Sequence, residues 1–228
     1  MPPRSYGRNP IRVQRPATFV LWAMLFALAP AIGVKAVERP VKIVVLGDSL
    51  SAGFGLPMNE AFPAKLAKAL DAKGIGVVVV NAGVSGDTAS GGLGRVDWSV
   101  PDGTDAVIVE LGANDALRGV DPTITKNALD KILRKLSDRH IAVLLAGMRA
   151  PRNMGPDYTR DFDDIYPALA STHSVVFYPF FLEGVAADPK LNQADGLHPN
   201  ASGVDTIVAR ILPRVEELIA RARSARGS

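Results

Sequence analysis

The amino-acid sequence predicts an α/β protein of three layers (α/β/α), with a doubly wound, five-stranded parallel sheet between helices. Short, continuous apolar runs rich in β-branched residues have the length and composition of strands buried on both faces. Segments with a helical period of apolar residues lie between these runs. The chain has 228 residues, 47% hydrophobic and 21% charged, which fits an ordinary globular protein of about one domain.

Each predicted element follows from its own pattern. The five strands are expected at residues 41–46, 77–80, 106–111, 141–146 and 175–178. Helices with one buried stripe are predicted around Phe62, Leu66, Ala69 and Leu70, and around Leu129, Ile132, Leu133 and Leu136. A last helix carries apolar residues from Val204 to Ile219, and Pro213 predicts a kink or break in it. This alternation of strand and helix indicates one sheet with helices on both faces.

The N-terminal residues have the features of a secretory signal peptide, which we assign to residues 1–36. Four arginines precede an apolar core of 11 residues (19–29), which is too short to cross a bilayer comfortably, and small residues follow it. We expect cleavage near Ala36 and a periplasmic or secreted protein. An uncleaved anchor is the alternative, since weakly apolar residues extend the run, but Pro30 favours removal. One domain is then expected over residues 37–222, followed by a flexible basic tail at 223–228.

The charges and the lack of cysteine exclude several classes of protein. The whole chain has a formal charge of +3, but residues 1–36 hold five of its 26 basic residues and none of its 23 acidic ones. The remaining 192 residues therefore carry a formal charge of −2, which argues against a nucleic-acid partner. With no cysteine in the sequence, disulfides, thiolate metal sites, a cysteine nucleophile and a lipoprotein anchor are excluded.

The unusual polar residues follow the predicted strands. The segments after the five strands contain G-D-S, N-A-G-V-S-G-D-T, G-A-N-D, G-M-R-A-P-R-N-M-G-P and D-G-L-H-P. Parallel sheets of this kind bind ligands in the crevice beyond the carboxyl ends of their strands. The sequence therefore predicts one site, at this edge of the sheet.

Two of these segments supply candidates for nucleophilic catalysis. Ser49 comes directly after a buried strand, and His198 lies three residues after Asp195, whose carboxylate could orient the imidazole. Alternatively, the G-D-S segment only caps a helix. His140 and His173 are expected to be structural, because they lie at a helix end and in a loop before a strand.

Two further segments offer donors for a developing oxyanion. Gly83 can bring its main-chain N–H close to a substrate, and Asn114 offers a side-chain amide. The alternatives are that Gly83 only forms a turn and that Asn114 only begins a helix. Asp115 is expected to cap or support, and Arg118 to hold its loop.

Taken in order, these segments resemble the sequence blocks of the SGNH (GDSL) hydrolase superfamily, from residue 41 to the last helix. The chain is most similar to the branch of periplasmic arylesterases and thioesterase I/lysophospholipase L1 proteins. The resemblance implies a flavodoxin-like SGNH hydrolase fold and a serine esterase that uses Ser49, Asp195 and His198. It also implies an oxyanion hole formed by the N–H of Ser49, the N–H of Gly83 and the amide of Asn114, with no metal and no organic cofactor.

Two loops resemble the arylesterase members of that branch, residues 147–158 and 178–192. They are expected either to wall an acyl pocket or only to cover the edge of the sheet. The candidate pocket residues are Met148, Met154, Phe180, Phe181 and Leu182. A small acidic cluster, Asp161, Asp163 and Asp164, is better explained by a helix start or a solvated face than by a metal site.

The expected partner is a small-molecule ester or thioester, with membrane contact only through the N-terminal segment before cleavage. Aryl esters, acyl esters of short to medium length, thioesters, lysophospholipids and acetylated sugars all remain open as substrates, and so does the oligomeric state. Two other classes were weighed: a non-catalytic module that binds lipids or glycans, and a nucleotide-binding protein. The second is disfavoured because the G-G-L-G before Arg95 is not a G-x-G-x-x-G motif.

Overall fold

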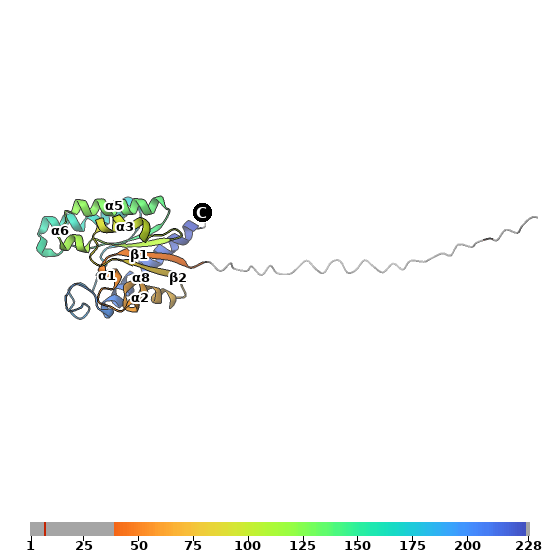
Figure 1. Cartoon of the computed structure of the whole chain (residues 1–228), viewed down its shortest axis with the longest axis horizontal. Helices are drawn as coiled ribbons and strands as arrows, with labels where there is room; N and C mark the ends of the chain where they lie inside the picture. The colour runs from red at the N-terminus through yellow and green to blue at the C-terminus, as the bar shows by residue number, and fades with distance from the viewer. Residues whose placement is uncertain (1–6, 8–38, 227–228) are drawn as a thin grey trace, which may run out of the picture. The chain divides into compact units, whose positions relative to one another are not determined.

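A computed structural model describes residue 7 and residues 39–226 of the chain (Figure 1). Five parallel strands form one sheet in the order β2-β1-β3-β4-β5, as the sequence predicted. The strands are β1 (Val41–Gly47), β2 (Val77–Gly83), β3 (Ala106–Glu110), β4 (Ala142–Ala146) and β5 (Val176–Tyr178). The chain therefore winds from β1 outward to β2, then back across β1 to β3, β4 and β5.

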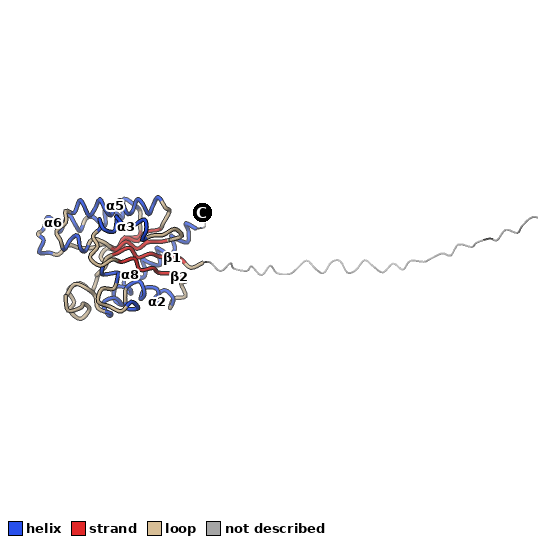
Figure 2. Tube along the Cα trace, viewed as in Figure 1, coloured by secondary structure: helices blue, strands red, loops and turns tan. Residues whose placement is uncertain are grey.

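Helices cover both faces of this sheet (Figures 1 and 2). On one face lie α3 (Ala89–Ser99) and α5 (Pro122–Asp138), and on the other lie α2 (Phe62–Asp71) and α8 (Ala201–Arg226). Shorter helices occur in the connections: α1 (Ser49–Ala52), η1 (Met58–Glu60), α4 (Ala113–Leu117), η2 (Arg152–Met154), α6 (Pro156–Asp163) and α7 (Ile165–His173). The three-layer architecture predicted from the sequence is confirmed.

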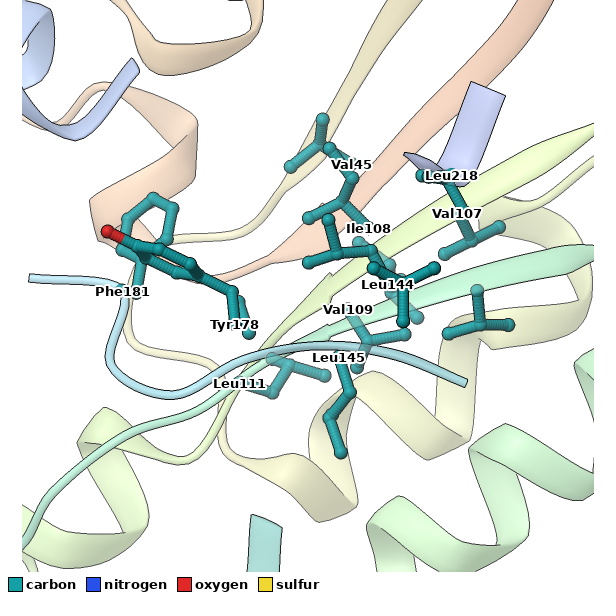
Figure 3. Close-up of a cluster of buried hydrophobic side chains, with 14 of the residues drawn as sticks. Val45, Val107, Ile108, Val109, Leu111, Leu144, Leu145, Tyr178, Phe181 and Leu218 are labelled. Carbon is teal, nitrogen blue, oxygen red and sulfur yellow. The ribbon is translucent and has the colours of Figure 1, made fainter. Parts of the chain in front are cut away.

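The core lies on the central strands. Val45, Ile108 and Leu144 occupy one register across β1, β3 and β4, and all three side chains are fully buried (Figure 3). Leu218 of α8 belongs to the same buried cluster. Fully burying an aliphatic side chain of this size stabilises the fold by about 1.5–3 kcal/mol, so these strands form a firm base for the loops at their ends.

Strand β2 and helix α8 differ most from the sequence-based expectation, while each of the other four strands differs by one residue at one end. Strand β2 continues to Gly83 instead of ending at residue 80, because its last residues pair with the end of β1. Helix α8 runs through Pro213 without a break, since Ile211 and Val215 on either side are fully buried and hold the helix against the core. Residues 223–226, expected to lie in a flexible tail, are part of α8.

The chain divides into two units, residues 1–38 and residues 39–228, and every contact described below belongs to the second unit. The signal peptide predicted at residues 1–36 lies outside the described residues, apart from Gly7. Within residues 39–226, none of the helices has the length and apolar character needed to span a membrane.

Candidate active site

The first loop of the site connects β1 to α1. Asp48 caps α1 by accepting the Leu50 N–H at 2.9 Å, so Ser49 is left as the first residue of this short helix. A side chain at Gly47 would come within 2.8 Å of the main-chain oxygen of Glu110, which explains the glycine before the turn. Because Asp48 forms the cap, the hydroxyl of Ser49 is available for another partner.

That partner is His198, which comes from the other end of the sequence. The Ser49 Oγ lies 2.9 Å from His198 Nε2, and His198 Nδ1 lies 2.7 Å from Asp195 Oδ2. The three side chains selected from the sequence therefore form one continuous hydrogen-bonded chain. Serine, histidine and aspartate in this order have the geometry needed to activate a hydroxyl group as a nucleophile.

Asp195 is held as an ionised carboxylate. Its Oδ1 accepts the N–H groups of His198 at 3.0 Å and Leu197 at 2.9 Å. These main-chain hydrogen bonds, together with the one from the imidazole, lower the pKa of Asp195 to about 2. The carboxylate thus stays charged at neutral pH and fixes the ring of His198 through Nδ1.

A glutamine that the sequence did not mark joins the two loops of this chain. Gln193 Nε2 donates to the main-chain oxygen of Phe54 at 2.7 Å and to that of Pro199 at 3.0 Å, and its own N–H donates to His198 O at 2.8 Å. The ring of Phe54 lies against the imidazole of His198, with centroids 4.5 Å apart. The loop after Ser49 and the loop of His198 are therefore tied directly together.

Asn114 joins the first loop to the second. It lies in α4, directly after β3, and its Nδ2 donates to Asp48 Oδ2 at 3.2 Å and to Asp87 O at 3.0 Å. Both amide hydrogens are thus engaged in this structure. The amide therefore lies between the loops that follow β1 and β2.

Gly83 and Gly86 differ as candidate donors. The Gly83 N–H donates to Asn81 Oδ1 at 3.0 Å, and a side chain at this position would come 2.6 Å from the Ala52 nitrogen. Gly86, with φ of 84°, lies in the turn that the Asp87 N–H closes onto Val84 O. Within the described part of the chain, the Gly86 N–H has no hydrogen-bond acceptor. Gly86 was not among the donors predicted from the sequence, although it lies in the S-G-D-T part of the segment after β2.

Asp115 and Arg118 support these loops. Asp115 is fully buried, and its carboxylate accepts the Ala89 N–H at the start of α3 at 2.8 Å and the Thr125 hydroxyl at 3.0 Å. Arg118 donates to Gly86 O at 2.9 Å. The two residues connect the loop after β3 to the loop after β2, as the sequence-based expectation of a supporting role requires.

Two buried carboxyl groups lie behind Ser49. Burial raises the pKa of Asp48 to about 6, although the bonds from Leu50 and Asn114 act in the opposite direction. Burial, and then the charge of Asp48, raise the pKa of Glu110 well above its usual value. Glu110 is the last residue of β3, and its Oε2 accepts the Asp48 N–H at 3.4 Å.

The proposed pocket residues divide into two groups. Met148 and Phe181 are 3% and 0% exposed and belong to the core, where Phe181 packs edge-on against Phe62 at 5.0 Å. For these two, the structure favours the alternative that they only cover the sheet. The other three are partly exposed: Met154, Phe180 and Leu182.

The other polar candidates have structural partners. His173 Nε2 lies 2.8 Å from Asp130 Oδ1, and Asp163 accepts the Ala150 N–H at 2.8 Å. Among the described residues, we find no cluster of three or more acidic, histidine or cysteine side chains arranged to hold a metal ion.

Comparison with known proteins adds independent information. Residues 45–205 match the model of the GDSL-like lipase/acylhydrolase family. The arylesterase of Vibrio mimicus is 43% identical over 165 residues, which cover 72% of this chain and 82% of that protein. The thioesterase 1/protease 1/lysophospholipase L1 of Escherichia coli strain K12 is 38% identical over 178 residues, 78% of this chain and 84% of its own. The crystal structure of TesA is similar with a TM-score of 0.74 and 36% identity, covering 78% of this chain and 99% of that chain.

Proposed function

The chain belongs to the GDSL-like lipase/acylhydrolase family, and from this premise we propose that it is an exported serine esterase that hydrolyses carboxylic esters. The observation that carries the proposal is the chain of contacts from Ser49 through His198 to Asp195, at 2.9 and 2.7 Å. No organic cofactor enters the proposed reaction.

The proposed reaction has two stages. Ser49 Oγ attacks the acyl carbon while His198 Nε2 takes the hydroxyl proton, and the protonated ring then gives that proton to the leaving alcohol or thiol. Water attacks the acyl-enzyme with His198 again acting as the base. Asp195 holds the ring through Nδ1 and stabilises its positive charge in both stages.

The oxyanion is held by three proposed donors. These are the Ser49 N–H, one amide hydrogen of Asn114 and a glycine N–H from the loop after β2. For Asn114 we propose that the hydrogen facing Asp48 turns to the substrate, since that bond, at 3.2 Å, is the longer of the two. For the glycine we favour Gly86 over Gly83, whose N–H donates to Asn81.

Several classes of ester and thioester are proposed as substrates. The names of the relatives include arylesterase, thioesterase and lysophospholipase, so aryl esters, acyl esters of short to medium length, thioesters and lysophospholipids are all candidates. Met154, Phe180 and Leu182 are the proposed contacts of the acyl group. The ratios of kcat/KM over a panel of these substrates identify the preferred one.

Export is proposed from residues 1–36 alone. The arginines, the short apolar core and the small residues after it support a signal peptide removed near Ala36, and therefore a periplasmic or secreted enzyme. Mass spectrometry of the protein isolated from its producing cells measures the N-terminus directly. A mass that includes residues 1–36 would favour the retained anchor.

The replacement Ser49→Ala tests the function. We expect it to abolish both hydrolysis of p-nitrophenyl butyrate and labelling by a fluorophosphonate, because the attacking oxygen is gone, while the melting temperature stays near that of the wild type. Ser85→Ala, at an exposed serine of the neighbouring loop, is the matched control and should keep full activity. Turnover by Ser49→Ala at the wild-type rate would refute the proposal. Absence of burst kinetics in the wild type, with ligand binding intact, would favour the non-catalytic binding module.

A further inference from the structure

Arg95 is a buried cation of α3 that the proposed reaction does not use. Arg95 as a whole residue is 6% exposed to solvent. Its Nε donates to Asp87 Oδ2 at 2.6 Å, Nη1 to Ala82 O at 2.7 Å and to Ser99 Oγ at 3.1 Å, and Nη2 to Gly47 O at 2.7 Å. A charged group in the core is costly unless it is paired and hydrogen-bonded, and this guanidinium has both kinds of partner.

Three of the four acceptors of Arg95 lie in or next to the loops that carry the proposed oxyanion donors, and the fourth, Ser99, belongs to α3 itself. Gly47 is the last residue of β1, two residues before Ser49, and Ala82 is the penultimate residue of β2, from which the loop with Gly86 begins. The third acceptor, Asp87, directly follows Gly86 in sequence, and its main-chain oxygen accepts the amide of Asn114 at 3.0 Å. One side chain therefore contacts the ends of β1 and β2 directly, and reaches the loop after β3 through Asp87.

We propose that Arg95 is a positioning residue of the esterase site, which fixes the loops after β1, β2 and β3 relative to one another and does not touch the substrate. The proposal rests on the proposed function. A guanidinium is suited to this role because its N–H groups are held in one rigid plane, so acceptors that bind it are fixed in mutual position. Lysine carries the same charge on a flexible stem and cannot hold three acceptors in that arrangement.

A purely structural role is the competing explanation. In that case Arg95 and Asp87 form a partly buried ion pair, at 2.6 Å, that stabilises the fold and leaves the chemistry unaffected. The two explanations differ in one measurable respect. A positioning residue changes the rate of each correctly folded active site, whereas a structural residue changes only the number of folded molecules.

Arg95→Lys and the double variant Arg95→Met/Asp87→Asn test the proposal. The double variant avoids leaving the partly buried Asp87 carboxylate without its partner. The matched control is Arg139→Met, since Arg139 is a partly buried arginine that donates to Val100 O at 2.7 Å. Active sites are counted by complete labelling with a fluorophosphonate, and kcat, KM and inhibition by n-butylboronic acid, which forms a tetrahedral adduct with serine, are then measured per labelled site.

We expect kcat per site to fall about 10- to 100-fold in both Arg95 variants, because small displacements of oriented groups have effects of that size. KM should change much less, and the affinity for the boronic acid should fall by the same factor as kcat/KM. Arg139→Met should lower the melting temperature and keep kcat per site.

Wild-type kcat and boronic acid affinity per site in both Arg95 variants would overturn the positioning role, whatever their stability. Failure of the proposed function gives a different result, since the wild-type protein would then not react with the fluorophosphonate at Ser49. In that event, NMR of the Asn114 side-chain amide still tests the positioning. Its resonances should shift in Arg95→Lys and not in Arg139→Met, and unshifted resonances in Arg95→Lys would overturn the inference.

Discussion

Asp48 and Glu110 are two buried carboxyl groups that lie next to each other beside Ser49, the proposed nucleophile. Their pKa values are raised, mainly by burial, so each group holds a proton more tightly in the folded chain than in the unfolded chain. The free energy of unfolding therefore falls as the pH rises from about 4, the pKa of an unfolded carboxyl, through the folded values. These two carboxyl groups beside Ser49 therefore make the fold less stable at neutral pH than at pH 4.

The replacement Glu110→Gln tests this account. The amide resembles the protonated carboxyl and keeps an oxygen that can accept the Asp48 N–H, so we expect the loss of stability between pH 5 and pH 8 to be smaller than in the wild type. Urea unfolding at the two pH values measures the difference. Glu217→Gln is the control, because Arg214 and Arg221 lower the pKa of Glu217. An unchanged pH dependence in Glu110→Gln would contradict the expectation.

Helix α1 and strand β2 show how a short element is held in place. Helix α1 has four residues, too few to be stable alone, and it lies against the end of β2 where Gly83 leaves room for the main chain of Ala52. Since Ser49 begins this helix, its position depends on that contact. The packing therefore indicates that a glycine is needed at position 83 because it lets the main chains of β2 and α1 approach closely.

The replacement Gly83→Ala tests this packing. A methyl group would come within 3 Å of the main chain of Ala52, so α1 must move. We expect a kcat at least about tenfold lower, since the displaced element carries the proposed nucleophile, together with a lower melting temperature. Gly76→Ala is the control, because a side chain there would have no neighbour within 4 Å. A Gly83→Ala protein with both values unchanged would disprove this dependence.

The sequence predicted the strands and helices whose buried residues form a recognisable apolar pattern. All five strands and the three helices with clear apolar periodicity are present. The end of β2 was missed because Asn81 and the two residues after it are held by pairing with β1, which a local pattern cannot show. Of the kink or break expected at Pro213, the break is absent, because packing of its neighbours outweighs the missing hydrogen bond of one proline.

The site residues that could be predicted from the sequence are those that follow a strand within a recognisable segment. Ser49, Asp195 and His198 meet, and Asn114 lies beside Asp48. Arg95 was missed because a charged residue in a helix normally faces solvent, and its burial depends on acceptors in β1, in β2 and in the loop before α3. Met148 and Phe181 were placed in a pocket wall because an apolar residue in a loop gives no indication of whether it faces the core or a ligand.

At the scale of the whole molecule, one aspartate joins both ends of the described domain. Asp105 accepts the Lys42 N–H at 2.8 Å and pairs with Arg39 and with Arg226. Arg226 also donates to Arg39 O at 3.0 Å and Pro40 O at 3.1 Å. Burial alone would raise the pKa of Asp105, but the two guanidinium groups and the Lys42 N–H outweigh it and hold the pKa well below its usual range.

Asp105→Asn should therefore lower the free energy of unfolding at pH 7 by about 1.5–3 kcal/mol, the usual range for hydrogen bonds to charged groups. A depressed pKa stabilises the fold above the unfolded pKa, near 4, and the stabilisation is lost as the pH falls below it. The difference from the wild type should thus shrink between pH 5 and pH 3, as measured by urea unfolding. Asp97→Asn, which removes an exposed ion pair with Lys135, is the control and should have little effect. A constant difference at all pH values would contradict this account.

Because residues 39 and 226 touch at the amino-terminal edge of the sheet while Ser49 lies at its carboxyl edge, the two ends of the domain can be connected without crossing the site. A short linker between them, with new termini opened at the exposed turn of residues 101–103, gives a circular permutant that keeps every contact of the catalytic loops. For the same reason, immobilisation on a support through a tag joined at residue 39 or residue 226 leaves the edge with Ser49 facing the solution.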